Sequence, residues 1–226
     1  MLRRAQARLS TALLPGGTRQ LCNYGVEDEQ LKKAPWLFVG VGNPGPKFLG
    51  TRHNVGFEMI DAVSESAGIT LSTIQHRAIL GEGTIKDSPV VLAKPQTYAN
   101  LIGDSIAPLM EQYCVPAEKI LVILDDMDTR ISKLQLVSKG GHGNHRGLMN
   151  LIAYLKGNRN FPRLRIGIGL PPEKMDPKAF VLQRFCEPER KLVEKSITQG
   201  VEIIRLVAAN GVEKTMDSIK REKMAS

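Results

Sequence analysis

The pattern of apolar and polar residues divides the chain after residue 34 into short segments of two kinds. Continuous apolar runs that end at turn-forming residues predict buried β-strands at 36–41, 89–93, 120–124 and 164–168. Apolar residues that recur with a 3.6-residue period predict helices at 54–68, 102–113, 146–155 and 187–209. Strands that alternate with helices in this way indicate an α/β fold.

We therefore predict a single three-layer α/β domain over residues 35–212. Its mixed, mostly parallel sheet would be covered by helices on both faces. An extended segment at 74–85 and a half-exposed strand at 133–137 would complete the sheet. Residues 213–226 are highly charged and are expected to form a tail that frays.

The composition is that of a globular protein and narrows the class only slightly. The chain has 226 residues, of which 42% are hydrophobic and 24% are charged. No run approaches the roughly 18 consecutive apolar residues of a membrane helix, so no membrane partner is expected. The three cysteines lie too far apart for a zinc knuckle.

The formal charge of +8 is concentrated in two stretches that contain no acidic residue. Residues 1–26 hold four arginines, and residues 129–172 hold eight lysines or arginines. Because these stretches carry +4 and +8, the rest of the chain is net acidic. The second stretch, called the basic stretch below, would attract a polyanion and bind it in a salt-dependent way. A solvated face that merely lacks acids is the simpler alternative.

Residues 1–34 have the pattern of an organelle transit peptide. Arginines alternate with Leu, Ala, Ser and Thr ahead of the turn-forming residues 15–17, and the continuous apolar core of a secretory signal is missing. The short, Arg-rich segment favours a mitochondrial over a chloroplast destination. An untargeted disordered tail is the alternative.

The segment Gly40–Gly45 fits the G-x-G-x-x-G pattern directly after a predicted strand, as in dinucleotide-binding proteins. In those proteins the third glycine lies where the phosphate-binding helix begins, whereas residues 46–53 intervene here. The acid about twenty residues further on, Asp61, falls inside a predicted helix. The sequence thus argues against NAD binding.

Polar side chains follow the carboxyl ends of three predicted strands: Asn43, then Tyr98 and Asn100, then Asp125. Ligands of open α/β sheets bind at that edge, and His53 closes the first of these loops. A neutral imidazole takes a proton from water near pH 7, and a carboxylate fixes its tautomer. His53 and Asp125 are therefore candidates for a general base and its orienter, with a structural histidine and a turn-capping aspartate as the alternative.

Other chemistries have less support. The sequence has no G-x-S-x-G elbow, and no cysteine has an obvious local base. The spacing of the four histidines does not match a metal site, so we predict hydrolysis without a metal or cofactor. His142 and His145 lie in a glycine loop, residues 138–147, where contact with phosphate or backbone is the simpler role.

Six motifs together resemble the bacterial-type peptidyl-tRNA hydrolase family. They run in family order: Val39–Gly45, Gly50–Phe57, Lys94–Asn100, Asp125–Asp128, Gly141–Gly147 and Phe161–Gly169. The resemblance extends from about residue 35 to residue 209, and several joint matches over that length are highly specific.

The resemblance implies a monomeric, cofactor-free esterase that cuts the bond between a peptide and the terminal ribose of tRNA. It implies that His53 activates water, that Asp125 orients His53, and that Asn43 senses the blocked amino group of the substrate. Further positions would contact substrate: Phe48, Tyr98, Asn100 and Arg146.

The basic stretch would then bind the acceptor arm of tRNA through phosphates, mostly without reading sequence. The candidate RNA-binding residues are Lys133, Lys139, His142, His145, Arg163 and Arg165.

Some residues depart from the usual family pattern. Phe48 stands where Tyr is usual, Ala99 where Met is usual, and Arg146 where Asn is usual, while Asn144 replaces a common Gly. Arg146 could strengthen phosphate binding at the expense of substrate positioning.

Residues 139–143 and 170–180 look most like the plant organelle branch of the family, which includes a chloroplast splicing factor for group II introns. A catalytically silent RNA-associated protein with an organelle splicing partner is therefore the alternative function. The presence of Asn43, His53, Asn100 and Asp125 favours a hydrolase acting in organelle translation.

Overall fold

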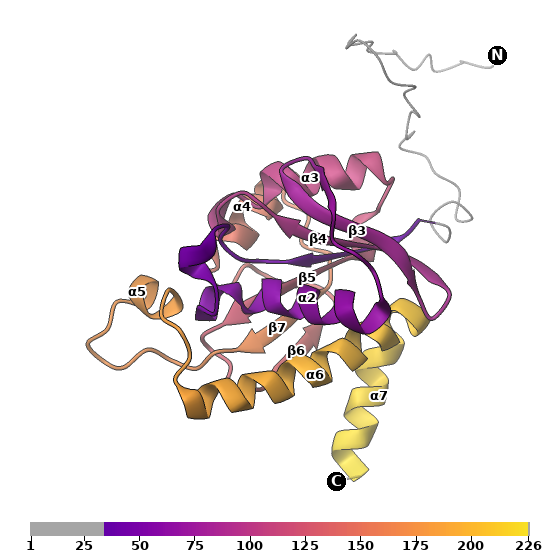
Figure 1. Cartoon of the computed structure of the whole chain (residues 1–226). Coiled ribbons are helices and arrows are strands. Elements are labelled where there is room, and N and C mark those ends of the chain that lie inside the picture. The colour runs from indigo at the N-terminus through magenta and orange to yellow at the C-terminus, as the bar shows by residue number, and fades with distance from the viewer. Residues whose placement is uncertain (1–33, 226) are drawn as a thin grey trace, which may run out of the picture.

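A seven-stranded sheet with the order β2-β3-β4-β1-β5-β7-β6 forms the centre of the molecule (Figure 1). The computed structural model describes residues 34–225. The strands are β1 (Trp36–Gly40), β2 (Thr73–Gln75), β3 (Ala78–Ile85), β4 (Ser88–Pro95), β5 (Ile120–Asp126), β6 (Leu134–Val137) and β7 (Arg163–Gly167). The four central strands β4, β1, β5 and β7 pair in parallel, whereas β3 and β6 pair antiparallel with their neighbours. This is the mixed sheet predicted from the apolar runs.

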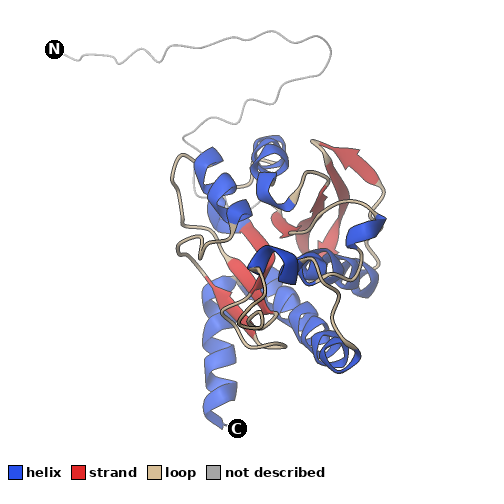
Figure 2. Ribbon diagram, turned by 90° about the vertical axis from the view of Figure 1, so that its left-hand side faces the viewer, coloured by secondary structure: helices blue, strands red, loops and turns tan. Residues whose placement is uncertain are grey.

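The strands β1 and β5 are almost entirely apolar and buried, because helices cover both faces of the sheet (Figure 2). The helices are α2 (Val55–Ala67), α3 (Gly103–Gln112), α4 (Arg146–Tyr154), α5 (Pro177–Val181), α6 (Glu187–Asn210) and α7 (Val212–Ala225). One core lies between the sheet and α2, α6 and α7, and the other lies between the sheet and α3 and α4. The predicted three-layer arrangement is confirmed.

Helix α2 begins very close to the carboxyl ends of the central strands. A side chain at Gly56 would lie 2.5 Å from the carbonyl oxygens of both Val41 and Ile123. Only glycine permits this approach. It brings the short 3-10 helix η2 (Arg52–Asn54), which precedes α2, to the edge of the sheet where β1 and β5 end.

The charged C-terminal segment is helical, so the prediction that it frays is wrong. Helix α7 packs against α6 and β6, and its residues Val212 and Thr215 are 7% and 1% exposed. The transit peptide proposed for residues 1–34 lies almost wholly outside the described residues. Within residues 34–225, no helix has the length and apolar character that a membrane span requires.

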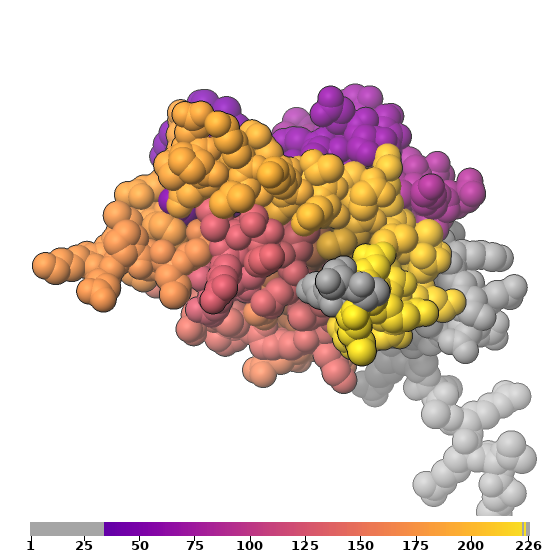
Figure 3. Space-filling model, turned by 90° about the horizontal axis from the view of Figure 1, so that it is seen from below, coloured from indigo at the N-terminus to yellow at the C-terminus, as the bar shows by residue number. Residues whose placement is uncertain are grey.

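The chain between β7 and α6 leaves the body of the domain and carries the short helix α5 (Figures 1 and 3). Where this segment returns to the domain, it is held against the start of η2. Thr51 forms a β-bridge with Arg184, and the Arg52 amide donates to the Gln183 carbonyl at 2.9 Å. The projecting segment is therefore anchored beside His53.

Candidate active site

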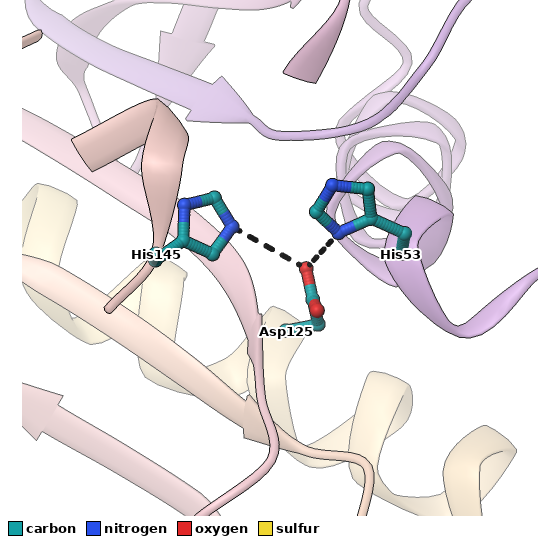
Figure 4. A group of neighbouring side chains, drawn as sticks. All are labelled: His53, Asp125 and His145. Carbon is teal, nitrogen blue, oxygen red and sulfur yellow. Dashed lines mark hydrogen bonds and ion pairs between the residues drawn. The ribbon is translucent and has the colours of Figure 1, made fainter. Parts of the chain in front are cut away.

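His53 and Asp125 form a close pair at the carboxyl edge of the sheet (Figure 4). Asp125 lies near the end of β5, and His53 is in the centre of η2. The His53 Nδ1 atom lies 2.7 Å from Asp125 Oδ1, with 18% and 4% of the two side chains exposed. Because Asp125 is ionised and accepts this bond, Nδ1 carries the ring proton of neutral His53 and Nε2 keeps its lone pair. That is the tautomer a general base requires.

The electrostatics of this pair favour an ionised Asp125 and a protonated His53. Burial by itself lowers the pKa of His53, but the charge of Asp125 and the hydrogen bond to it raise that pKa above its ordinary value. Burial by itself raises the pKa of Asp125, but His53 and His145 hold it far below its usual range. Asp125 therefore stays ionised and stabilises an imidazolium formed on His53.

His145 lies on the other side of the same carboxylate. Its Nε2 is 3.6 Å from Asp125 Oδ1, and its ring centroid is 5.5 Å from that of His53. Its Nδ1 accepts a hydrogen bond from the Leu148 amide at 3.4 Å and so caps α4. We predicted a contact with phosphate or backbone for His145; the structure instead places it in the His53 and Asp125 group, in addition to its backbone contact.

Asn43 is held by two partners, the backbone of Ala99 and the side chain of Asn54. Its Oδ1 accepts from the Ala99 amide at 2.9 Å, and its backbone exchanges two 2.9 Å hydrogen bonds with the Asn54 side chain. Among the described residues, none of these bonds uses the Asn43 side-chain NH₂. Asn54 directly follows His53, and its side chain thus ties Asn43 to the segment that carries His53. The sequence did not single out Asn54.

Three of the four predicted substrate-contact residues are neighbours in sequence of residues in this centre. Tyr98 and Asn100 flank Ala99, and both are exposed. The short helix η3 (Ala99–Leu101) packs against α4, where exposed Arg146 follows His145. Phe48 is half-buried in η1 (Pro46–Phe48), with the Lys47 ammonium 4.8 Å from its ring.

The six predicted RNA-binding residues do not form one cluster. Arg165 and His142 line a pocket together with Asp125 and His145, so they adjoin the site. Lys133 is exposed beside the start of β6. Lys139 lies at the opposite edge of the sheet, in a pocket with Trp36 at the start of β1.

Arg163 contradicts the prediction that it contacts RNA, because its side chain is fully buried. Its Nη2 donates to the Gly140 carbonyl at 2.8 Å, and its guanidinium lies 4.1 Å from the Phe161 ring centroid. Burial, with help from Arg165 and Arg159, lowers the pKa of Arg163 to about 10. Arg163 therefore holds the glycine loop through the Gly140 carbonyl.

A buried cluster around Arg52 was also missed by sequence reasoning. The Arg52 guanidinium lies 3.0 and 2.8 Å from the two carboxylate oxygens of Glu189. It also lies 4.4 and 4.8 Å from the ring centroids of Phe180 and Phe185. Because Arg52 precedes His53, this cluster fixes the backbone that carries the candidate base. The partner is 137 residues away, so no local pattern could reveal it.

The histidine spacing argument against a metal site also needs correction. Although His53, Asp125 and His145 are distant in sequence, their ligand atoms all lie within 4.8 Å of one another. The fold thus assembles two imidazoles and a carboxylate that sequence spacing could not bring together.

Comparison with known proteins agrees with this fold and identifies the family. Residues 37–226 match the family model described as peptidyl-tRNA hydrolase. The chain belongs to the peptidyl-tRNA hydrolase family, as its motifs predicted, and hence to a family of hydrolases.

Two plant relatives and one solved structure illustrate this. The mitochondrial peptidyl-tRNA hydrolase of Oryza sativa is 50% identical over 80% of this chain and 72% of its own length. A chloroplastic group IIB intron splicing facilitator of Zea mays is 51% identical over 78% of this chain and 69% of its own length. The crystal structure of peptidyl-tRNA hydrolase from Acinetobacter baumannii has a TM-score of 0.77 and 34% identity, and the match covers 83% of this chain and 95% of that chain.

Proposed function

We propose that the protein hydrolyses the ester bond between peptide and tRNA in peptidyl-tRNA. The observation that carries this proposal is the 2.7 Å contact from His53 Nδ1 to Asp125 Oδ1, which leaves Nε2 as a proton acceptor at the mouth of the site. Family membership supports the substrate class.

In the proposed mechanism His53 Nε2 takes a proton from water, and the resulting hydroxide attacks the ester carbonyl carbon. Asp125 stabilises the imidazolium. The tetrahedral intermediate then collapses, and the ribose oxygen leaves with the proton held by His53. The products are free tRNA and the peptide carboxylic acid, which releases its proton to water to become a carboxylate.

Asn43 is proposed to hold the substrate rather than move protons. Its Oδ1 is used by Ala99, so its side-chain NH₂ faces the substrate as a donor. A neutral amide donor can hold the carbonyl of an acylated amino group without adding charge. A free, positively charged amino group offers no such acceptor, which supports discrimination against aminoacyl-tRNA.

We further propose that tRNA phosphates lie along Arg165, His142 and Arg146, the basic residues next to the site. Residues 1–34 are proposed as a transit peptide. The rice mitochondrial relative supports the mitochondrion, and a chloroplastic peptidyl-tRNA hydrolase of Arabidopsis thaliana, 47% identical, supports the chloroplast as alternative.

A second function is favoured by a specific observation. The maize splicing facilitator is as similar to this chain as the rice hydrolase is, at 51% against 50% identity. A role as an RNA-associated protein in organelle group II intron splicing is therefore the competing proposal.

One experiment separates the two. The purified chain is incubated with N-acetyl-aminoacyl-tRNA and, in parallel, with unblocked aminoacyl-tRNA, and binding of a group II intron RNA is measured. The hydrolase proposal predicts release of the blocked amino acid only. No release from either substrate, combined with tight intron binding, would overturn it in favour of the splicing role.

A further inference from the structure

The group formed by His53, Asp125 and His145 has a feature that the proposed hydrolysis does not use. His145 Nε2 is buried, points at Asp125 and has no hydrogen-bond partner among the described residues, since its 3.6 Å approach exceeds bonding distance. A buried polar atom without a partner is costly. Figure 4 shows both imidazole rings directed at one carboxylate oxygen.

We propose that this group is a binding site for a divalent cation of the zinc class, and that the cation inhibits the protein. Its ligands are His53 Nδ1, an Asp125 oxygen and His145 Nε2. Two imidazoles and one carboxylate form a donor set that zinc accepts, with a fourth position left for water. The oxygen-preferring ions Mg²⁺ and Ca²⁺ are poorly matched to two imidazoles.

The geometry requires only small movements to accept the ion. Zinc bonds of roughly 2.0–2.1 Å in a tetrahedron place ligand atoms about 3.4 Å apart. The His53 to Asp125 distance of 2.7 Å therefore opens, and the other ligand distances, none above 4.8 Å, close. The segment before His145 contains Gly143 and Asn144, with positive φ of 52° and 60°.

Inhibition follows from the tautomer of His53. Without metal, Nδ1 carries the ring proton and Nε2 carries the lone pair that accepts a proton from water. A cation on Nδ1 requires the lone pair there, so the ring proton of the neutral imidazole moves to Nε2. His53 Nε2 then has no lone pair with which to accept a proton from water, and the hydrogen bond from His53 to Asp125 is lost as well. This inhibition rests on the proposed function, whereas the binding does not.

Cobalt(II) is the probe for the site, because its visible absorption reports coordination number without reference to activity. The full-length protein is titrated with Co²⁺, and then with Zn²⁺ to displace it. We expect an intense band of tetrahedral type that zinc abolishes. His145→Gln should weaken Co²⁺ binding at least about tenfold. His76→Gln is the matched control, because His76 is exposed and bonds to Gln112 on another surface.

Three results would overturn the site: no band at millimolar Co²⁺, equal binding by His145→Gln, or equal loss in His76→Gln. If circular dichroism shows that His145→Gln is unfolded, histidine NMR of the unaltered protein replaces it. Zinc should then shift the ring resonances of His53 and His145 but not those of His76, and the opposite pattern rejects the site.

Activity is measured last, with and without zinc and after a chelator. Metal binding without inhibition of an active enzyme would refute the inhibitory role. Metal binding by a protein that hydrolyses nothing would reject the proposed function and leave the metal site standing.

Discussion

Two loops bring histidines to Asp125, and each is held by a buried arginine side chain. The first, the His53 loop, is residues 42–54 and contains its arginine, Arg52. That guanidinium has a charged partner in Glu189 at 2.8 Å, a carbonyl partner in Arg184 at 3.3 Å and two aromatic rings against it. The charge of Arg52 is therefore balanced where it is buried.

The second loop, the glycine loop, is held by Arg163, whose guanidinium has fewer partners than that of Arg52. Arg163 has one hydrogen bond, to Gly140, and one aromatic ring, while its Nε and Nη1 are buried without a partner among the described residues. The nearest charges that act on it are cations. The loop above it contains Gly140, Gly143 and Asn144 at positive φ.

The difference between the two arginines indicates that the two loops have different roles in the site. The His53 loop is held by paired charges, which suits the proposed role of His53, because a general base must stay within hydrogen-bond reach of its carboxylate. The glycine loop is held at fewer points, which suits a segment that adjusts to RNA or, as proposed above, to a cation. The predictions below test this contrast.

The largest expected effect is on catalysis at the His53 loop. We expect His53→Ala to lower turnover of N-acetyl-aminoacyl-tRNA at least about 10²-fold while tRNA affinity is retained. His142→Ala, in the glycine loop, is the control and should act mainly on binding. Unchanged turnover in the His53 variant would exclude it as the base.

The acid limb of the pH profile tests the pairing of His53 with Asp125. The raised pKa of His53 means that the base is lost as pH falls through a value above the ordinary histidine pKa. Below it, kcat/KM should fall about tenfold per pH unit. Asp125→Asn removes the charge that raises this pKa, so the decrease in kcat/KM should begin at a lower pH. The maximum value of kcat/KM should also be reduced. An acid limb that stays in place would contradict the pairing.

The support of the His53 loop is tested by Glu189→Gln. Removing the charge opposite buried Arg52 should lower the free energy of unfolding by about 2 kcal/mol, measured by urea denaturation. This is less than the roughly 3–5 kcal/mol of a fully buried pair, because 28% of the Glu189 side chain is exposed. Glu187→Gln, in a surface pair with Lys191, is the control and should change stability little.

Arg163→Met should have the smallest effect, below about 1 kcal/mol of unfolding free energy. An apolar side chain of similar length removes a buried charge that has no counter-ion within residues 34–225, and such replacements are often nearly neutral. The lost bond to Gly140 is the main cost. Destabilisation as large as that of Glu189→Gln would show that the two loops are held equally.

The sequence predicted the layers well because each element shows its own pattern. Strand β5 is a continuous apolar run, and α2 ends at Gly68, a left-handed cap with φ of 66°. Helix α7 was missed because only a few of its residues, such as Val212 and Thr215, are buried, and they stand among many charged residues.

The same distinction applies to the site. His53 and Asp125 were predicted because polar residues after parallel strands meet at one edge of the sheet. The burial of Arg163 was not, because charge counted along a chain does not show which face of a strand is covered. The approach of His145 to Asp125 depends on the path of the glycine loop across the sheet, which no local pattern specifies.

The most direct test of the account is a double-mutant cycle in turnover of N-acetyl-aminoacyl-tRNA, using His53→Ala, Asp125→Asn and the double variant. If Asp125 acts through His53, as their 2.7 Å contact indicates, the double variant should be no slower than His53→Ala alone. Rate losses that multiply in the double variant would show that the two residues act independently and would contradict the account.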